Sequence, residues 1–179
     1  VLASCATSGC HGGPPGAGAL LVKDVGTLQP SGGQGRGYRR GTENLPAACA
    51  IAAALESRAF AEAMPQLQSL RAKLEEEIVK SGGVVIAANG TRIATIGAYA
   101  MPGIASSSQL VQLDLAGIAV SAGSACSSGS MKPSRVLAAM AVPEEIASSV
   151  IRVSFGPSTS EPDIARFVGE WRKIASRGK

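Results

Sequence analysis

The chain has 179 residues, of which 45% are hydrophobic and 17% charged, a composition that supports a buried core and argues against a disordered or fibrous protein. The net charge of +4 is mild, and the basic residues form no stripe with interleaved aromatics, so nucleic acid binding is not expected. His11 is the single histidine and the four cysteines form no Cys-x-x-Cys pair, so neither a metal site nor a Ser-His-Asp triad is expected.

The first 43 residues are rich in glycine and proline. They contain one expected strand at 18–23, after a Gly-Pro-Pro-Gly turn, and a glycine loop with interspersed arginines at 31–41. One or two short strands cannot bury a core alone. We therefore interpret residues 1–43 as the edge of another domain and residues 44–179 as a domain of their own.

Two consecutive helices are expected next. Asn44 is a good N-cap and Pro46 suits a first helical turn, which predicts a helix through residues 47–63. Pro65 is expected to break that helix and to start a second one. The second helix carries apolar residues at helical spacing, namely Leu67, Leu70, Leu74 and Ile78.

Strands and helices alternate in the rest of the chain. Strands are expected at 84–88, 93–100, 117–121 and 150–155, and helices at 107–116 and 133–140. The last helix begins at a capping-box pattern, Ser160–Asp163, and continues with an apolar face. The fold class expected is therefore α/β, with a small sheet packed against helices.

A Gly/Ser loop at residues 122–131 carries Cys126. The small neighbours leave the thiol accessible and let the loop move, so the sulfur could attack a substrate atom and carry the product elsewhere. Lys132 or Arg135 could promote the thiolate form that such a nucleophile needs. The alternative is a flexible surface loop with an incidental cysteine.

Two further segments suggest anion binding. The glycine loop offers the Thr42 hydroxyl, arginines and a following helix N-terminus, which together suit a phosphate, although the Gly-Lys-Ser/Thr of a nucleotide loop is absent. The alternative is a turn with solvated arginines. Arg152 lies in an otherwise apolar strand and suits a substrate carboxylate, a structural ion pair or an edge position.

Taken together and in this order, these segments resemble the C-terminal half of a cysteine desulfurase, a pyridoxal phosphate (PLP) enzyme of the class V aminotransferase-like group. The matching segments are GGPPGAGALLV (12–22), GGQGRGYRRGTEN (32–44), GIAVSAGSACSSGSMKPSRVLAAM (117–140) and IRVSFGPSTSEPDI (151–164). The resemblance implies the small domain of a fold-type I PLP enzyme, with an edge piece of the large PLP-binding domain. The long loop around Cys126 is similar to that of the group serving iron–sulfur cluster assembly.

The resemblance also implies roles for single residues. PLP would form a Schiff base with the substrate L-cysteine, and Cys126 would accept its sulfur as a persulfide while alanine is released. The persulfide would pass to an iron–sulfur scaffold or sulfur-carrier protein. Arg152 matches the arginine that binds the substrate carboxylate. Thr42 matches the threonine that reaches the cofactor phosphate of the other subunit in a homodimer, with Arg39 and Asn44 in support.

The start of the chain departs from the family. Counting back from Pro14 places Cys10 where the Schiff-base lysine belongs, Gly9 in place of its histidine neighbour and Thr7 in place of the motif's serine. Residues 1–11 could be an out-of-frame lead-in to a truncated gene, or the lysine could be substituted in a divergent protein. We favour the first interpretation, because all three positions change together and the match resumes abruptly at Gly12.

Three functions stay open at this point. The chain could be part of a cysteine desulfurase, inactive alone because the lysine and the N-terminal half of the family are lacking. It could instead be a non-catalytic remnant, or a module that keeps the dimer and carrier surfaces. Selenocysteine lyase or another PLP lyase is a weaker alternative, given Cys126 in its long loop. No signal peptide or long apolar run occurs, so a cytoplasmic protein without membrane contact is expected.

Overall fold

The computed structural model describes residues 3–7, 18–33, 35–38, 40–123 and 134–177. The chain forms two compact units, Val1–Ala61 and Glu62–Lys179. The division between these units falls inside a helix. The domain boundary that composition suggests after residue 43 stays a prediction.

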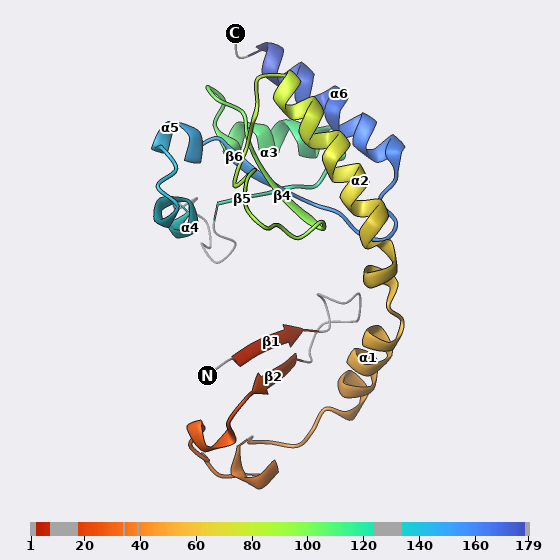
Figure 1. Ribbon diagram of the computed structural model, residues 1–179, viewed down its shortest axis with the longest axis vertical. Helices are drawn as coiled ribbons and strands as arrows, with labels where there is room; N and C mark the ends of the chain where they lie inside the picture. Colours follow the sequence, from red (N-terminus) through yellow and green to blue (C-terminus); the bar gives the residue numbers. More distant parts are fainter. Residues whose placement is uncertain (1–2, 8–17, 34, 39, 124–133, 178–179) are drawn as a thin grey trace. The chain divides into compact units, whose positions relative to one another are not determined.

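The first unit contains a two-stranded antiparallel sheet and one helix. Strand β1 (Ala3–Thr7) pairs with β2 (Gly18–Val22), which confirms the strand expected at 18–23 (Figure 1). Two short 3-10 turns follow, η2 (Val25–Thr27) and η3 (Gly35–Gly37), and then helix α1 (Leu45–Glu56). No described side chain between residues 18 and 61 is buried.

The prediction for the first two helices is partly wrong. The Oδ1 of Asn44 accepts a hydrogen bond from the backbone N–H of Ala47 (3.2 Å), which confirms the cap. However, α1 ends at Glu56, and α2 (Ala59–Lys80) begins after Arg58, whose φ of 51° lies in the left-handed region. Pro65 lies within α2 and does not break it. A proline removes one backbone hydrogen bond, and the buried leucines that follow hold the helix together.

A four-stranded antiparallel sheet forms the centre of the second unit, in the order β3-β4-β6-β5. Its strands are β3 (Val84–Val85), β4 (Ile96–Ala100), β5 (Ser121–Ala122) and β6 (Val150–Ser154). Strand β3 is shorter than the expected 84–88, and the prediction of a strand at 117–121 is wrong except at its last residue, because β5 begins only there. After β3 the chain turns at Ala87, where φ is 54°. Before β5, Gly117 (φ 71°) ends the preceding helix, and the chain reaches the sheet only at Ser121.

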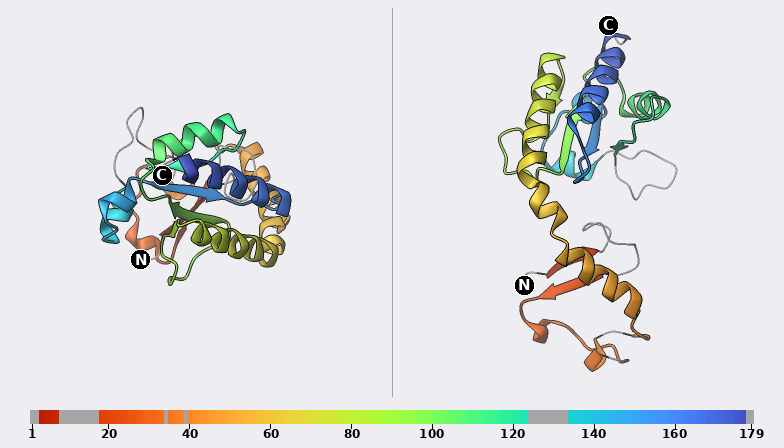
Figure 2. Two further views of the ribbon diagram at one scale, coloured as in Figure 1. Left: turned by 90° about the horizontal axis from the view of Figure 1, so that it is seen from above. Right: turned by 90° about the vertical axis from the view of Figure 1, so that its right-hand side faces the viewer.

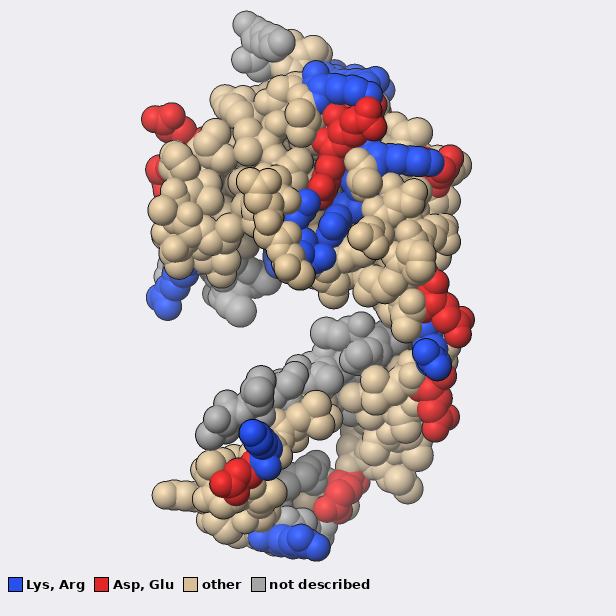
Figure 3. Space-filling model, viewed as in Figure 1, with Lys and Arg blue, Asp and Glu red and all other residues tan. Residues whose placement is uncertain are grey.

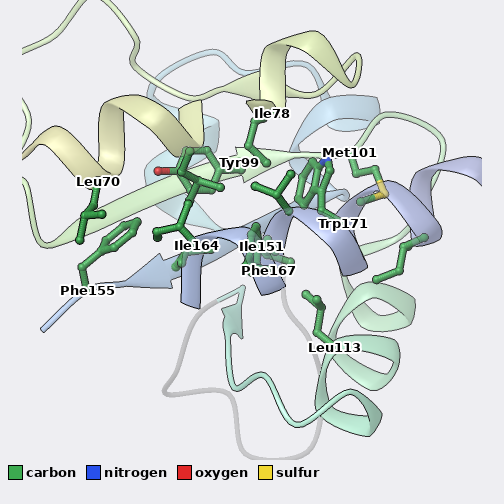
Figure 4. Close-up of a cluster of buried hydrophobic side chains, with 14 of the residues drawn as sticks. Leu70, Ile78, Tyr99, Met101, Leu113, Ile151, Phe155, Ile164, Phe167 and Trp171 are labelled. Carbon is green, nitrogen blue, oxygen red and sulfur yellow. The ribbon is translucent and has the colours of Figure 1, made fainter. Parts of the chain in front are cut away.

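Helices cover both faces of this sheet. On one face lie α2, α3 (Ser106–Leu115) and α6 (Glu161–Arg177), and the main core lies between them and the strands (Figures 1, 2 and 4). Its fully buried members include Leu67, Leu74, Ile78, Tyr99, Leu113 and Ile151. A smaller cluster lies on the opposite face, where α4 (Arg135–Ala139) and α5 (Glu144–Ala147) pack on Ala100 and Val150.

The last helix confirms its predicted start. The backbone N–H and the hydroxyl of Ser160 both donate to Oδ2 of Asp163, at 2.9 and 2.6 Å. Ion pairs between Lys73 and Glu161, and between Glu77 and Arg172, connect α2 with α6. Figure 3 shows acidic and basic side chains close together on the surface of this unit.

Candidate functional site

Arg152 occupies the middle of β6, and its neighbours fix the side of the sheet on which it lies. Ile151 and Val153 belong to the main core, whereas Arg152 is exposed. Because side chains alternate between the faces of a strand, Arg152 lies on the face opposite that core. In the sheet register it stands between Ala98 of β4 and Ser121 of β5. We call Ala98, Arg152 and Ser121 the Arg152 row.

Helices α4 and α5 cover only part of this face of the sheet, and Arg152 lies just beyond the covered part. Val150, two residues earlier, is buried against Leu137 of α4. Beyond it, Arg152 and Ser154 are both exposed. β6 lies between two strands, so Arg152 is not at a sheet edge, and no acidic side chain in the described part of the chain pairs with it. Its guanidinium is thus available to an external anion.

Cys126 lies in residues 124–133, outside the described residues, but both flanks of that segment are described. On one side the segment follows Gly123 and β5, which pairs with β6 beside Arg152. On the other side it precedes Ser134, whose hydroxyl oxygen accepts a hydrogen bond from the backbone N–H of Leu137 (3.4 Å) at the start of α4. Leu137 packs with Val150 of β6. Both flanks are therefore attached next to the strand that carries Arg152.

Thr42 belongs to the first unit, whereas Arg152 belongs to the second. Thr42 is exposed in the segment between the glycine loop and α1. The carbonyl of Gly37 accepts hydrogen bonds from the backbone N–H groups of Ser31 and Gly32, at 2.8 and 3.1 Å. The guanidinium of Arg40 donates to the Ser31 carbonyl, with Nε at 2.8 Å. This loop therefore folds onto itself, while Gln34 and Arg39 lie outside the described residues.

The sequence did not point to Ser121 and Ala98 as neighbours of Arg152. Ser121 lies 31 positions before Arg152, and Ala98 lies 54 positions before it. Their proximity depends on strand register. Local patterns do not specify which residues of two distant strands pair, although the buried alternation in each strand gives a partial signal.

A polar cluster occurs on the other side of the sheet. Both carboxylate oxygens of Glu75 accept hydrogen bonds from Arg92, at 2.6 and 3.0 Å, and Arg71 lies 3.5 Å from the same carboxylate. Burial, and secondarily the Glu75 charge, raises the pKa of the Tyr99 hydroxyl. An open cleft of about 570 Å³ is lined by Glu75, Arg92 and residues of α2 and β3. It shares no residue with the Arg152 row.

Clusters of metal ligands and membrane-spanning helices are both absent from the described residues. No three His, Cys, Asp or Glu side chains among them come together as metal ligands. No described helix combines the length and apolar character needed to cross a membrane.

The comparisons with known proteins agree with this fold. A profile of the family described as "Aminotransferase class-V" matches residues 11–167, so the chain belongs to that family. Over 160 residues it is 38% identical to a cysteine desulfurase of Rhodobacter capsulatus, covering 86% of this chain and 42% of the relative. A cysteine desulfurase of Bradyrhizobium diazoefficiens is 36% identical over 171 residues, covering 92% and 44%. The chain thus spans less than half the length of these relatives.

Solved structures confirm the predicted fold class. A "NifS-like protein" matches with a TM-score of 0.84 and 26% identity, over 99% of this chain and 47% of that one. The cysteine desulfurase CsdA of Escherichia coli matches with a TM-score of 0.75, over 99% and 46%, and at 21% identity this likeness concerns the fold alone. The mixed helix and sheet architecture is that of part of a fold-type I PLP enzyme.

The family implies PLP, and the described residues do not form a complete site for it. Thr42 offers an exposed hydroxyl that suits a phosphate oxygen, but Arg40 is occupied by the Ser31 carbonyl. Lys23 is the single lysine among the described residues of the first unit, and it is exposed. Cys10, at the expected lysine position, lies outside the described residues.

Proposed function

We propose that this chain is the sulfur-accepting part of a cysteine desulfurase. Arg152 binds the carboxylate of L-cysteine, and Cys126 accepts the sulfur as a persulfide for an iron–sulfur scaffold or sulfur-carrier protein. One observation supports this most: Arg152 is exposed, without an ion-pair partner among the described residues, on the strand beside which both flanks of the Cys126 segment are attached. The resemblance to cysteine desulfurases assigns the same two residues.

The side chains suit these tasks chemically. A guanidinium presents a planar fork that binds a carboxylate with two parallel hydrogen bonds. The thiolate of Cys126 attacks the substrate sulfur, so that an S–S bond forms as the substrate C–S bond breaks. The bonding electron pair stays with the substrate carbon, and protonation there gives alanine. In a complete enzyme, PLP would supply the electron sink for this carbon chemistry.

The rest of such a site has to come from outside the described residues. The chain covers 42% and 44% of the two cysteine desulfurases described above, so we do not expect it to turn over cysteine alone. In this proposal residues 1–43 are a remnant of the large PLP-binding domain and residues 44–179 the small domain. Thr42 would serve the cofactor phosphate of the other subunit in a cytoplasmic homodimer.

Persulfide transfer tests the role of Cys126. An intact cysteine desulfurase loaded with ³⁵S-labelled L-cysteine is mixed with this chain, and label retained on the chain without reductant is measured. The wild type and Cys49→Ser should be labelled, because Cys49 is an exposed free thiol that the proposal does not use. Cys126→Ser should not be labelled. Equal labelling of the two variants would remove Cys126 from this role.

A second candidate is a non-catalytic module that keeps the dimer and carrier surfaces. The incomplete PLP site among the described residues favours it. Purified chain would then show no PLP absorbance but would still bind an iron–sulfur scaffold protein. Sulfide and alanine production from cysteine by the chain with added PLP would exclude this candidate.

A further inference from the structure

We propose that the hydroxyl of Ser121 is a second ligand of the anionic group that Arg152 binds. This inference rests on the proposed function and extends it. Arg152 supplies the positive charge, and Ser121 donates one more hydrogen bond to the same carboxylate. In this proposal Ser121 is a substrate-binding residue, and it favours substrates whose α-carboxylate can contact both Arg152 and Ser121.

The sheet register brings the two side chains together. Ser121 of β5 stands directly opposite Arg152 of β6, and Ala122 stands opposite Ile151. Ala122 and Ile151 contribute to the main core, so Ser121 and Arg152 share the opposite face. Directly opposed residues in an antiparallel pair have their Cβ atoms about 4.5–5.5 Å apart. A guanidinium on its flexible stem can therefore reach a carboxylate that is held over Ser121.

Ser121 is also free for such a contact. It is exposed, and its hydroxyl has no hydrogen-bond partner in the part of the chain that the structure describes. Other serines near this sheet donate their hydroxyls to local carbonyls: Ser148 to Glu145 at 3.2 Å, and Ser149 to Ile146 at 2.8 Å. The hydroxyl of Ser121 has no such internal use among the described residues.

The other neighbours of Arg152 are less suited than Ser121 to donate a hydrogen bond to the carboxylate. Ala98, on its other side in the row, has no polar side-chain atom. Ser154 lies on the same face, but two residues along the strand, about 6.6 Å away at the usual rise per residue. Ser121 is thus the polar side chain opposite Arg152 in its row. Ser121 also precedes Cys126 by five positions in the sequence. A carboxylate bound to Ser121 and Arg152 would therefore hold β5 against β6 just before the Cys126 segment begins.

Carboxylate binding can be measured on the full chain by NMR, without catalysis. The side-chain Nε–H signal of Arg152, assigned by its loss in Arg152→Lys, is followed during titration with L-alanine. L-Alaninamide, which lacks the carboxylate, is the ligand control. We expect L-alanine and not the amide to shift the signal. A hydrogen bond to a charged group contributes enough that Ser121→Ala should weaken binding about tenfold.

Two variants control for indirect effects. Ser154→Ala removes a hydroxyl from the same face and should change the affinity less than twofold. Ser121→Thr keeps the hydroxyl in a residue that suits a strand, so it should bind like the wild type. If Ser121→Ala binds as tightly as Ser154→Ala while the wild type responds to L-alanine, the Ser121 inference is wrong and the Arg152 proposal stands. If the wild type gives no L-alanine response at Arg152, both are overturned.

Discussion

The ring of Tyr99 packs over the α-carbon of Gly97, two residues earlier in β4. A Cβ on Gly97 would overlap the Oη and Cζ atoms of Tyr99 and would lie 2.8 Å from its Cε2. Residues i and i+2 of a strand share one face, so the missing side chain of Gly97 provides the space for the ring. Tyr99 is fully buried at the centre of the main core (Figure 4).

Gly97→Ala should therefore destabilise the second unit. Overpacking a well-filled core costs about 1–3 kcal/mol, because the ring and the backbone both have to move. Urea unfolding followed by the fluorescence of Trp171, the single tryptophan and a core residue, measures the change. Gly169→Ala is the matched control: no atom lies within 4 Å of its added Cβ, and alanine in a helix should raise stability by about 0.5–1 kcal/mol.

A companion variant separates the hydroxyl from the ring. Tyr99→Phe in the Gly97→Ala background should restore little stability, because the ring carbons Cζ and Cε2 still meet the added methyl group. Full recovery would mean that the hydroxyl alone causes the conflict, contrary to the packing described above.

The buried Tyr99 hydroxyl predicts a loss of stability at alkaline pH. Burial raises its pKa above the ordinary value of 10.0, so the folded chain keeps a proton that the unfolded chain releases. The contribution is complete below pH 10 and decreases above it, by roughly 1.4 kcal/mol per pH unit for one proton. Unfolding free energies at pH 9 to 11 should fall less steeply for Tyr99→Phe than for the wild type. Equal slopes in the wild type and Tyr99→Phe would contradict this prediction.

Glu75 should matter more to stability than the exposed acidic residues. Its side chain and those of Arg71 and Arg92 are only 11–18% exposed, so Glu75→Gln would leave two arginines without their counter-charge in a desolvated place. Breaking a fully buried pair from one side costs about 3–5 kcal/mol, and this partly buried cluster should lose less, about 1–3 kcal/mol. Lys73→Ala removes an ion pair whose partners are 56% and 69% exposed and should change stability little. Equal effects of the two variants in urea unfolding would contradict this ranking.

The sequence predicted the elements that depend on local patterns. The caps at Asn44 and Ser160 and the apolar face of α2 were correct, because each depends on residues within one or two turns. The prediction that Pro65 breaks the helix is wrong, because proline only disfavours a helix interior, and buried contacts outweigh the lost hydrogen bond. The short extent of β5 depends on where the chain returns to β6, which no local pattern states.

The candidate site shows the same contrast between residues that a local pattern identifies and residues that distant strand pairing brings together. Arg152 stood out as a charge in an apolar strand, and Cys126 as a thiol among small residues. Ser121 could not be distinguished from the many other serines of the chain, because its position opposite Arg152 follows from the pairing of strands that are distant in sequence.

A carboxylate placed on the protein itself should compete with the substrate at Arg152. Ser154 is exposed on the same face as Arg152, two residues along β6, so Ser154→Glu can pair with the guanidinium without disturbing the core. We expect it to weaken L-alanine binding several-fold in the NMR titration, whereas the neutral Ser154→Gln of similar size should bind nearly as the wild type. High salt should reduce the difference between the two, because exposed ion pairs are screened. An equal loss in both variants would indicate that steric blockage, and not charge, controls access to Arg152.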